Sequence, residues 1–422
     1  MLNQIYNFFL EEDVETEIKR TLVQLNLTPL MAENTPAGPT GLPPRKVDTF
    51  TGDVIHHDTY PEINPLTSSD CSEKAVLITG ASKGLGRAIA IGYAEAGASH
   101  IAVAARSDVS STVAAVREAA KNAGRDEPTV FALEMDVSDM ASVRAAAERL
   151  TTEWRRLDIL VNNAGYMAPF NLLLDTDDDE YMKAWDVNYW GTYRVTKAFL
   201  PLMLKGGDKT IVNMSSVAAH FMGAGGGAYH VSKFALIRFT EFVQDEYGGQ
   251  GVLAFSIHPG GIPTDLSSNL PEKLQFRMTD TPELAAHSIP YLTSQKREWL
   301  GGRWLSCMWD MPKLITMEKE IVENNLLKFK LRVAFPNISR SRASTSDVAK
   351  NAACLDQRAG LTTCRAPGVS EGYLPYQPAH DGSEMHGFSE MQLSANRSML
   401  QDPRNNRKKN KLPKRSDFGS GG

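Results

Sequence analysis

Short runs of consecutive apolar residues recur along the middle of the chain and alternate with longer segments of helical periodicity. The helical segments, such as 142–157 and 233–247, repeat their apolar residues every three to four positions. The apolar runs occupy 75–80, 100–106, 129–136, 157–163, 210–216 and 252–258. Uninterrupted apolar strands that alternate with helices are typical of a parallel sheet covered on both faces. The pattern predicts an α/β fold, a doubly wound parallel sheet of about seven strands with helices on both faces.

This alternation stops near both ends of the chain. Residues 1–47 combine a candidate amphipathic helix, which packs on the protein itself or binds a partner or membrane surface, with a Pro/Gly linker. Residues 336–422 are rich in proline, glycine, serine and basic residues, and they hold too few apolar residues to offset the entropy lost on ordering. We therefore expect one folded domain over 48–335, preceded by an extension and followed by a disordered basic tail.

Composition and charge narrow the classes of function. The chain is 42% hydrophobic and 23% charged, which is ordinary for a globular protein. Its net charge of −5 combines an acidic body with the basic tail, which argues against nucleic acid as a partner of the body. Four scattered cysteines without a C-x-x-C motif indicate neither a metal site nor disulfides, and they fit a cytoplasmic setting. No apolar run is long enough to predict a membrane span.

A glycine-rich turn follows the first apolar run and begins a helical segment. Its sequence is TGASKGLG, residues 79–86. Glycines permit a tight turn and let backbone N–H groups approach a pyrophosphate, while the helix N-terminus favours negative charge. The strand, turn and helix together predict a dinucleotide-binding Rossmann fold. The predicted cofactor-binding residues of the turn are Gly80, Ser82, Lys83, Gly84, Leu85 and Gly86.

The end of the second apolar run bears on the choice of dinucleotide. Arg106 stands there, and its guanidinium suits a 2′-phosphate, with Lys83 as a second positive charge. These residues favour NADP(H). Asp108 would instead bind a ribose hydroxyl of NAD if the strand ended later than we expect.

A tyrosine and a lysine lie four residues apart in the sequence YHVSK, residues 229–233. On a helix, Tyr229 and Lys233 share one face. An ammonium next to a phenol lowers the phenol's pKa from about 10, so that the pair can move a proton to or from a carbinol oxygen. The Y-x-x-x-K pattern alone is common, but Ser216 and the NNAG sequence at 162–165 both end apolar runs, where ligands bind in open α/β sheets.

Taken together, these motifs resemble the short-chain dehydrogenase/reductase family over about residues 50–335. The family's motifs occur in order: T-G-x-x-x-G-x-G at 79–86, N-N-A-G at 162–165, Asn188, Ser216, Y-x-x-x-K at 229–233 and a P-G segment ending at Thr264. Segments 52–65 and 301–333 are similar to fungal members, many of which act on polyketide-type secondary metabolites. The resemblance also implies a homo-oligomer.

The resemblance implies catalytic roles for four residues. Tyr229 would be the general acid/base, and Lys233 would lower its pKa and hold the nicotinamide ribose. Ser216, with Ser215 as its competitor, would hydrogen-bond the substrate carbonyl, and Asn188 would hold a water in a proton relay.

The resemblance further places the cofactor along the carboxyl edge of the sheet. The adenine and adenosine side would be lined by Asp136, Val137, Asn162 and Ala164. The nicotinamide carboxamide and phosphates would be contacted by Ile262 and Thr264. The function implied is an NADP(H)-dependent ketoreductase that interconverts a ketone and a secondary alcohol on a polyketide-like small molecule. The alternative is a catalytically silent NADP(H)-binding sensor or scaffold.

Apolar and aromatic residues near the expected strand ends are candidates for the substrate pocket, with ordinary core packing as the other interpretation. They are Met167, Phe170, His220, Phe221, Met222 and Trp304.

Overall fold

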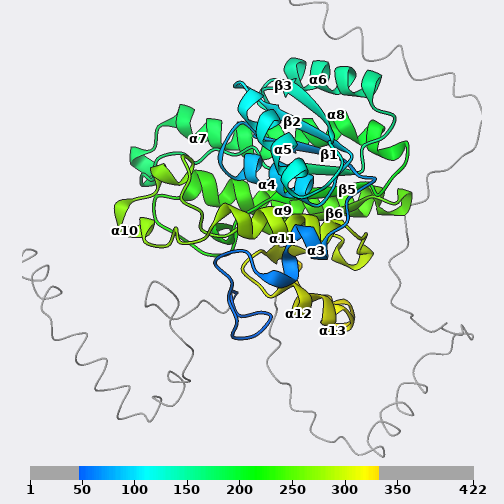
Figure 1. Ribbon diagram of the computed structural model, residues 1–422. Helices are drawn as coiled ribbons and strands as arrows, with labels where there is room; N and C mark the ends of the chain where they lie inside the picture. Colours follow the sequence, from blue (N-terminus) through cyan, green and yellow to red (C-terminus); the bar gives the residue numbers. More distant parts are fainter. Residues whose placement is uncertain (1–46, 332–422) are drawn as a thin grey trace, which may run out of the picture. The chain divides into compact units, whose positions relative to one another are not determined.

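Seven parallel strands form the centre of the computed structural model, which describes residues 47–331 (Figure 1). Their spatial order is β3-β2-β1-β4-β5-β6-β7, so the direction of progression reverses between β1 and β4. The strands are β1 (Ala75–Thr79), β2 (His100–Ala105), β3 (Thr129–Glu134), β4 (Ile159–Asn162), β5 (Thr210–Met214), β6 (Leu253–His258) and β7 (Trp304–Ser306). The predicted seven-stranded parallel sheet is confirmed. The predictions for 1–46 and 332–422 lie outside the described residues.

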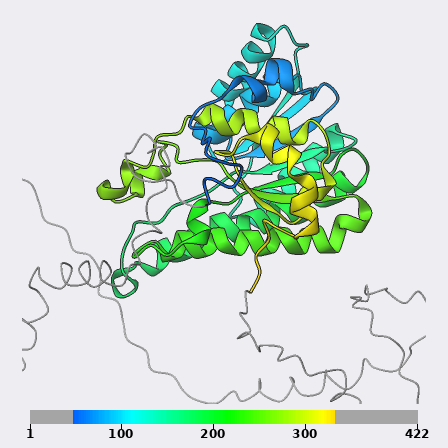
Figure 2. The same ribbon diagram turned by 90° about the horizontal axis from the view of Figure 1, so that it is seen from below.

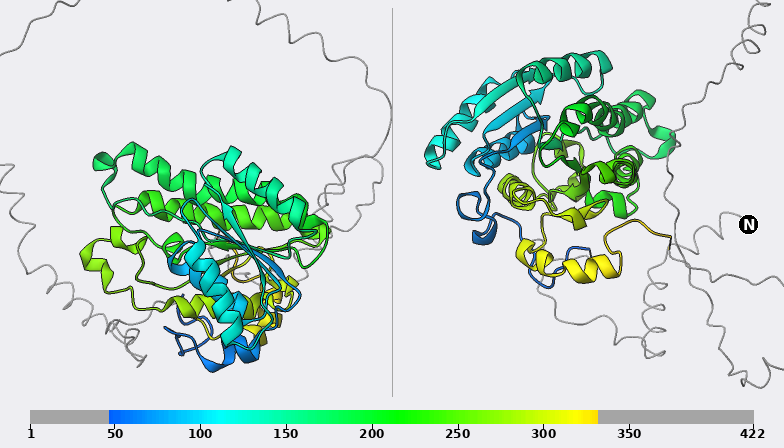
Figure 3. Two further views of the ribbon diagram at one scale, coloured as in Figure 1. Left: turned by 45° about the horizontal axis from the view of Figure 1, so that its top comes forward. Right: turned by 90° about the vertical axis from the view of Figure 1, so that its right-hand side faces the viewer.

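Helices cover both faces of this sheet, as Figures 2 and 3 show. One face packs against α4 (Gly84–Glu95), α5 (Ser110–Asn122) and α11 (Pro282–Thr293). The other face packs against α6 (Met140–Glu153), α8 (Thr192–Leu204) and α9 (Gly227–Tyr247). Shorter helices are α3 (Pro65–Ser68), α7 (Asp178–Trp185), α10 (Glu272–Gln275), α12 (Met311–Thr316) and α13 (Glu318–Glu323). The described residues contain no helix that is long and apolar enough to cross a membrane.

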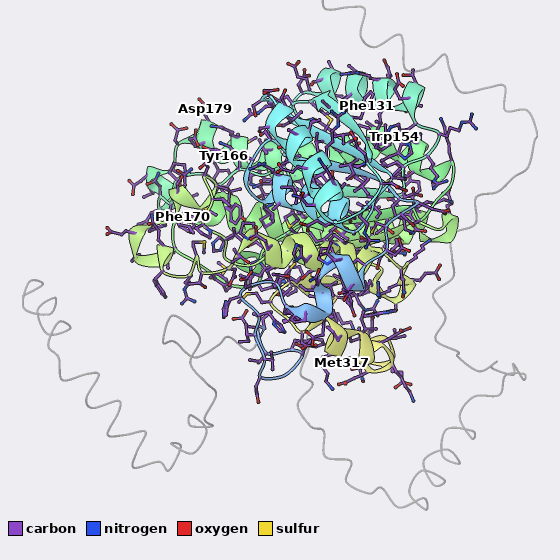
Figure 4. All side chains as sticks on the ribbon, in the orientation of Figure 1. Phe131, Trp154, Tyr166, Phe170, Asp179 and Met317 are labelled. Atoms are coloured by element: carbon purple, nitrogen blue, oxygen red, sulfur yellow. The ribbon has the colours of Figure 1, made fainter. Side chains whose placement is uncertain are left out.

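Successive residues of each strand pack on opposite faces. In β1, Val76 and Ile78 belong to the cluster under α4 and α11, while Leu77 belongs to the cluster under α6 and α8. This alternation explains why the strands are apolar throughout, since both faces are dry. The edge strand β3 is partly exposed, and its Phe131 lies near Trp154 and beneath the Arg149 guanidinium (Figure 4).

Residues 47–64, which we call the N-terminal strap, lie against the segment that follows β7. The Trp309 indole donates a hydrogen bond to the Val47 carbonyl (2.7 Å), and the Met311 amide donates to the Tyr60 hydroxyl (2.8 Å). The Phe50 and Trp309 rings are 4.9 Å apart. Figure 1 shows the strap in blue beside α12 and α13 in yellow. Two segments far apart in the sequence therefore form one layer beside the sheet.

Helices α4 and α11 approach each other closely at Gly92. A Cβ atom on Gly92 would lie 2.2 Å from the Ala286 carbonyl oxygen, which is backbone and moves only with its helix. The close approach brings α11, and the loop that precedes it, against the helix that follows the glycine-rich turn.

We expect Gly92→Ala to lower the free energy of unfolding by about 2 kcal/mol, because the added methyl overpacks the α4–α11 contact. Urea denaturation measures this loss. Gly249→Ala is the control, since its Cβ would meet nothing within 4 Å. Equal stability of the two variants would contradict the account of this contact.

Candidate active site

The glycine-rich turn between β1 and α4 forms an open cradle. Gly80 and Gly84 have φ values of +66° and +54°, a left-handed backbone that favours glycine. A Cβ atom on Gly86 would lie 2.3 Å from the Gly80 carbonyl oxygen, so a side chain there would displace the turn. No described side chain caps the first turn of α4. The residues present therefore fit a bound phosphate group, because N–H groups at a helix N-terminus attract anions.

Hydrogen bonds from two neighbouring elements hold this turn in place. The Thr79 hydroxyl accepts from the backbone N–H groups of Asn163 and Ala164 (both 3.0 Å), and the Asn163 amide donates to the Thr79 carbonyl (2.9 Å). On the other side, the Thr112 hydroxyl of α5 donates to the Ala81 carbonyl (2.9 Å). Neither Asn163 nor Thr112 was assigned a role from sequence, although Asn163 lies within a motif that the sequence singled out.

The Asn162 side chain points into the protein. Its amide donates to the Thr196 hydroxyl (3.0 Å) and to the Asn213 side chain (2.9 Å), and the residue is buried. The Asn162 side-chain amide is thus engaged inside the protein, and the contact of Asn162 with the adenosine stays a prediction.

Arg106 is the first residue after β2, and its side chain is mostly exposed. Its Nη1 atom is 3.8 Å from the Asp136 carboxylate, which brings two predicted cofactor residues together. Asp108 instead accepts hydrogen bonds from the Ser110 amide and hydroxyl, which lower the pKa of its carboxyl group. Asp108 thus lies at the start of α5, whereas Arg106 stands at the strand end. A cavity of about 570 Å³ adjoins Arg106 and is also lined by Lys183 and Arg194.

The loop after β6 lies opposite the glycine-rich turn. The Thr264 methyl group would be 3.6 Å from a Cβ atom on Gly84, and the exposed Lys83 and Asp265 side chains form an ion pair between the turn and the loop. Ile262 is buried in the same loop. Val137, a predicted adenine contact, packs closely on Gly191. The structure therefore brings the predicted phosphate and nicotinamide residues to one edge of the sheet.

Tyr229 and Lys233 are both buried on α9. Burial raises the pKa of the Tyr229 phenol to about 12, and a hydrogen bond with the Ser216 hydroxyl opposes this rise. Burial also lowers the pKa of the Lys233 ammonium to about 8. The Lys233 Nζ atom donates to the Met214 carbonyl (2.8 Å) and lies 5.7 Å from the centre of the Tyr229 ring.

Burial thus disfavours the charged form of both groups. The expectation that Lys233 lowers the pKa of Tyr229 stays a prediction. The sequence showed the spacing of the two residues but not the depth of their burial.

The two adjacent serines after β5 have different partners. The Ser215 hydroxyl donates to the Lys233 carbonyl (3.0 Å) and so fastens α9 to the sheet. The Ser216 hydroxyl accepts from the Ala218 amide (3.1 Å) and lies close enough to Tyr229 to oppose the rise of its pKa. Ser216, rather than Ser215, therefore lies beside the Tyr229 hydroxyl.

Asn188 lies in a π-helical turn, Asp186–Gly191, between α7 and α8. Its side chain accepts from the Tyr166 amide (2.8 Å) and donates to the Tyr166 carbonyl (2.8 Å) and the Ser232 hydroxyl (3.0 Å). Ser232 in turn donates to the Tyr229 carbonyl (2.8 Å). Asn188 thus joins the loop after β4 to α9. Tyr166 and Ser232 were missed in the sequence, although Ser232 lies inside the Y-x-x-x-K motif. The predicted water at Asn188 stays a prediction.

Apolar side chains pack around Tyr229. They are Met167, Phe170, Ala218, Leu266 and Leu270. The Phe170 and His230 rings are 6.0 Å apart, and Figure 4 shows Phe170 and Tyr166 on the side of the molecule that carries α7 and α10.

Four of the six pocket candidates lie on the loops around this cluster. Phe221 packs on His230, with ring centres 5.3 Å apart, while Met222 is almost fully exposed. His220 and Trp304 lie elsewhere, because they line a cavity of about 310 Å³ together with Phe50 and Trp309. Among residues 47–331, no group of three or more acidic, cysteine or histidine side chains could hold a metal ion.

Comparisons with known proteins agree with this geometry. Residues 74–275 match the model of the short chain dehydrogenase family. The short chain dehydrogenase citE of Monascus ruber is 48% identical over 278 residues, which cover 65% of this chain and 94% of that protein. A structure described as a putative short chain dehydrogenase from Pseudomonas syringae is 30% identical, with a TM-score of 0.51, and the match covers 60% of this chain and 99% of that one.

A second solved structure carries a cofactor. It is described as a putative NAD(P) dependent gluconate 5-dehydrogenase from Beutenbergia cavernae with bound NADP at low occupancy. It is 27% identical, with a TM-score of 0.50, and the match covers 60% of this chain and 99% of that one. The sheet order, the motifs and these matches agree, and the chain belongs to the short-chain dehydrogenase/reductase family.

Proposed function

We propose that this protein is an NADP(H)-dependent oxidoreductase that interconverts a ketone and a secondary alcohol on a polyketide-like small molecule. The observation that carries the proposal is the buried group formed by Tyr229, Ser216 and Lys233 at the edge of the sheet that also bears the glycine-rich turn. A bound nicotinamide would supply or accept the hydride. The family membership supports an oxidoreductase activity. The choice of cofactor, the class of substrate and the roles of the residues are our proposals.

The residues of the chain handle the proton. With a pKa of about 12, the Tyr229 phenol is protonated at neutral pH and can donate its proton to a carbonyl oxygen during reduction. The Ser216 hydroxyl would hydrogen-bond that same oxygen. Lys233 has a pKa of about 8, so its side chain carries a proton at neutral pH. Its positive charge would stabilise the phenolate that forms when Tyr229 gives up its proton.

Arg106 supports the choice of NADP(H) over NAD(H). Its guanidinium is exposed immediately after β2, and the competing carboxylate of Asp108 is hydrogen-bonded at the start of α5. The hydrogen bond between the Ala81 amide and the Ala104 carbonyl (3.1 Å) holds the turn beside the end of β2. A 2′-phosphate at this point would meet a planar cation suited to bidentate contact.

The apolar cluster around Tyr229 supports a substrate with an apolar or ring-bearing body. The alternative, a catalytically silent NADP(H)-binding sensor or scaffold in the same fold, requires no chemistry from the buried Tyr229. Family resemblance also favours a homo-oligomer, and the scattered cysteines fit a cytoplasmic setting.

Replacement of Tyr229 by phenylalanine should reduce turnover by about two to four orders of magnitude, because the proton donor is removed from the buried site. Carbonyl-dependent oxidation of NADPH measures this loss. Tyr247→Phe, at the far end of the same helix, is the control and should retain activity. Turnover of the Tyr229 variant near the wild-type rate would contradict the proposed role.

Replacement of Arg106 by alanine should weaken the preference for NADPH over NADH by about tenfold or more, because a charge-assisted contact to the 2′-phosphate is lost. The ratio of kcat/KM for the two cofactors measures this preference. Arg117→Ala removes another exposed arginine, on α5, and should leave the ratio unchanged. A wild-type protein that prefers NADH would refute the choice of NADP(H).

Replacement of Lys233 by methionine should abolish activity and raise the free energy of unfolding at pH 7 by about 2 kcal/mol, because a buried ammonium is removed. Above pH 8 the folded protein loses the Lys233 proton, whereas the unfolded chain keeps it to about pH 10. Wild-type stability therefore rises relative to the variant between pH 8 and pH 10. Urea denaturation of both proteins across this range tests the sign, and a constant difference would contradict it.

A further inference from the structure

One ion pair joins the N-terminal strap to the segment before α11. The His57 Nδ1 atom is 2.5 Å from the Asp280 Oδ1 atom. Only 2% of the Asp280 side chain is exposed, compared with 27% for His57. The backbone secures the same contact, because the Thr281 amide donates to the His57 carbonyl (2.9 Å). The histidine is thus fixed against a carboxylate that has almost no access to water.

The second oxygen of the same carboxylate holds the loop after β6. Asp280 Oδ2 accepts from the Gly261 amide (2.5 Å), and the Asp280 amide donates to the Gly261 carbonyl (2.9 Å). Gly260 has a φ of +112°, and a Cβ atom there would lie 2.7 Å from Asp280 Oδ2. The glycine pair lets the loop approach the carboxylate closely enough for both hydrogen bonds.

The residues that follow Gly261 are those that face the cofactor turn. Ile262 is the next residue, and the Thr264 methyl group lies beside Gly84. Asp280 in turn precedes α11, which is packed without a gap on α4. The carboxylate therefore connects the loop to the rigid helix pair beneath the glycine-rich turn, and His57 orients that carboxylate from the strap.

We propose that His57 and Asp280 are positioning residues, which hold the Pro259–Thr264 loop in the shape that receives the nicotinamide end of the cofactor. The proposal rests on the proposed function, since it assumes that this loop contacts NADP(H). Removal of His57 leaves a nearly inaccessible oxygen of Asp280 without its hydrogen-bond partner, so the loop loses its anchor. The N-terminal strap then contributes to cofactor affinity through its hold on this loop.

His57→Ala and His287→Ala make a matched pair for the test. Both histidines join the strap to the region of α11, since His287 Nδ1 is 2.6 Å from the Thr59 hydroxyl. Within residues 47–331, His287 makes no hydrogen bond to Asp280 or Gly261, and its other partner is Glu95 at 3.3 Å. Loss of strap attachment alone would therefore affect both variants alike, whereas loss of loop positioning would affect only His57→Ala.

The readouts are the Kd for NADPH from fluorescence titration and the KM and kcat for NADPH. We expect His57→Ala to weaken NADPH binding about tenfold and to raise KM more than it lowers kcat. His57→Asn, whose amide N–H replaces the Nδ1 donor, should recover most of the affinity. His287→Ala should bind NADPH as the wild type does. If His57→Ala does not fold, Asp280→Asn provides the same comparison, with the same loss expected.

An unchanged Kd in His57→Ala, or an equal loss in His287→Ala, would overturn the inference while leaving the proposed function intact. A wild-type protein that binds neither NADPH nor NADH would overturn the proposed function and, with it, this inference.

Discussion

A pair of hydrogen-bonded strand ends supports the whole site. Thr79 closes β1 and Asn163 follows β4, and each uses both its backbone and its side chain to hold the other. These two strands are neighbours in the sheet at the point where the strand order reverses, which is where open α/β sheets bind ligands. The contact fixes the glycine-rich turn on one side and the NNAG loop on the other, so the turn and the loop share one support.

From this pair, a continuous series of contacts reaches α9. The NNAG loop continues to Tyr166, whose backbone is held by the Asn188 side chain, and Asn188 reaches α9 through Ser232. Ser232 hydrogen-bonds the carbonyl of Tyr229 itself. The position of the tyrosine is thus set relative to the turn by main-chain and buried polar contacts rather than by exposed side chains. Such networks are rigid when every member has a partner.

Much of the fold and most of the site residues could be predicted because their signals are local. Strands buried on both faces read as apolar runs, and the glycine-rich turn and the Y-x-x-x-K spacing each fit within a few residues. Strand β7 has only three residues and gives no such run. The pKa of Tyr229 depends on burial, which a spacing cannot show. The direction of the Asn162 side chain depends on Thr196 and Asn213, which lie on other elements.

The contact between His57 and Asp280 could not be predicted from the sequence, for a different reason. The two residues are 223 positions apart, and neither stands in a motif. Only the folded chain brings the strap, the loop after β6 and α11 to one point.

The proposed function depends on the transfer of a hydride between NADPH and a carbonyl carbon at this site. The most direct measurement uses NADPH that carries deuterium at the transferred position, with a panel of polyketide-like ketones, and follows the label by mass spectrometry. We expect one deuterium on the carbinol carbon of the alcohol product, transferred about a hundredfold or more slowly by Tyr229→Phe. Tight binding of NADPH by the wild type without transfer of the label to any ketone would contradict the account and favour a sensor or scaffold.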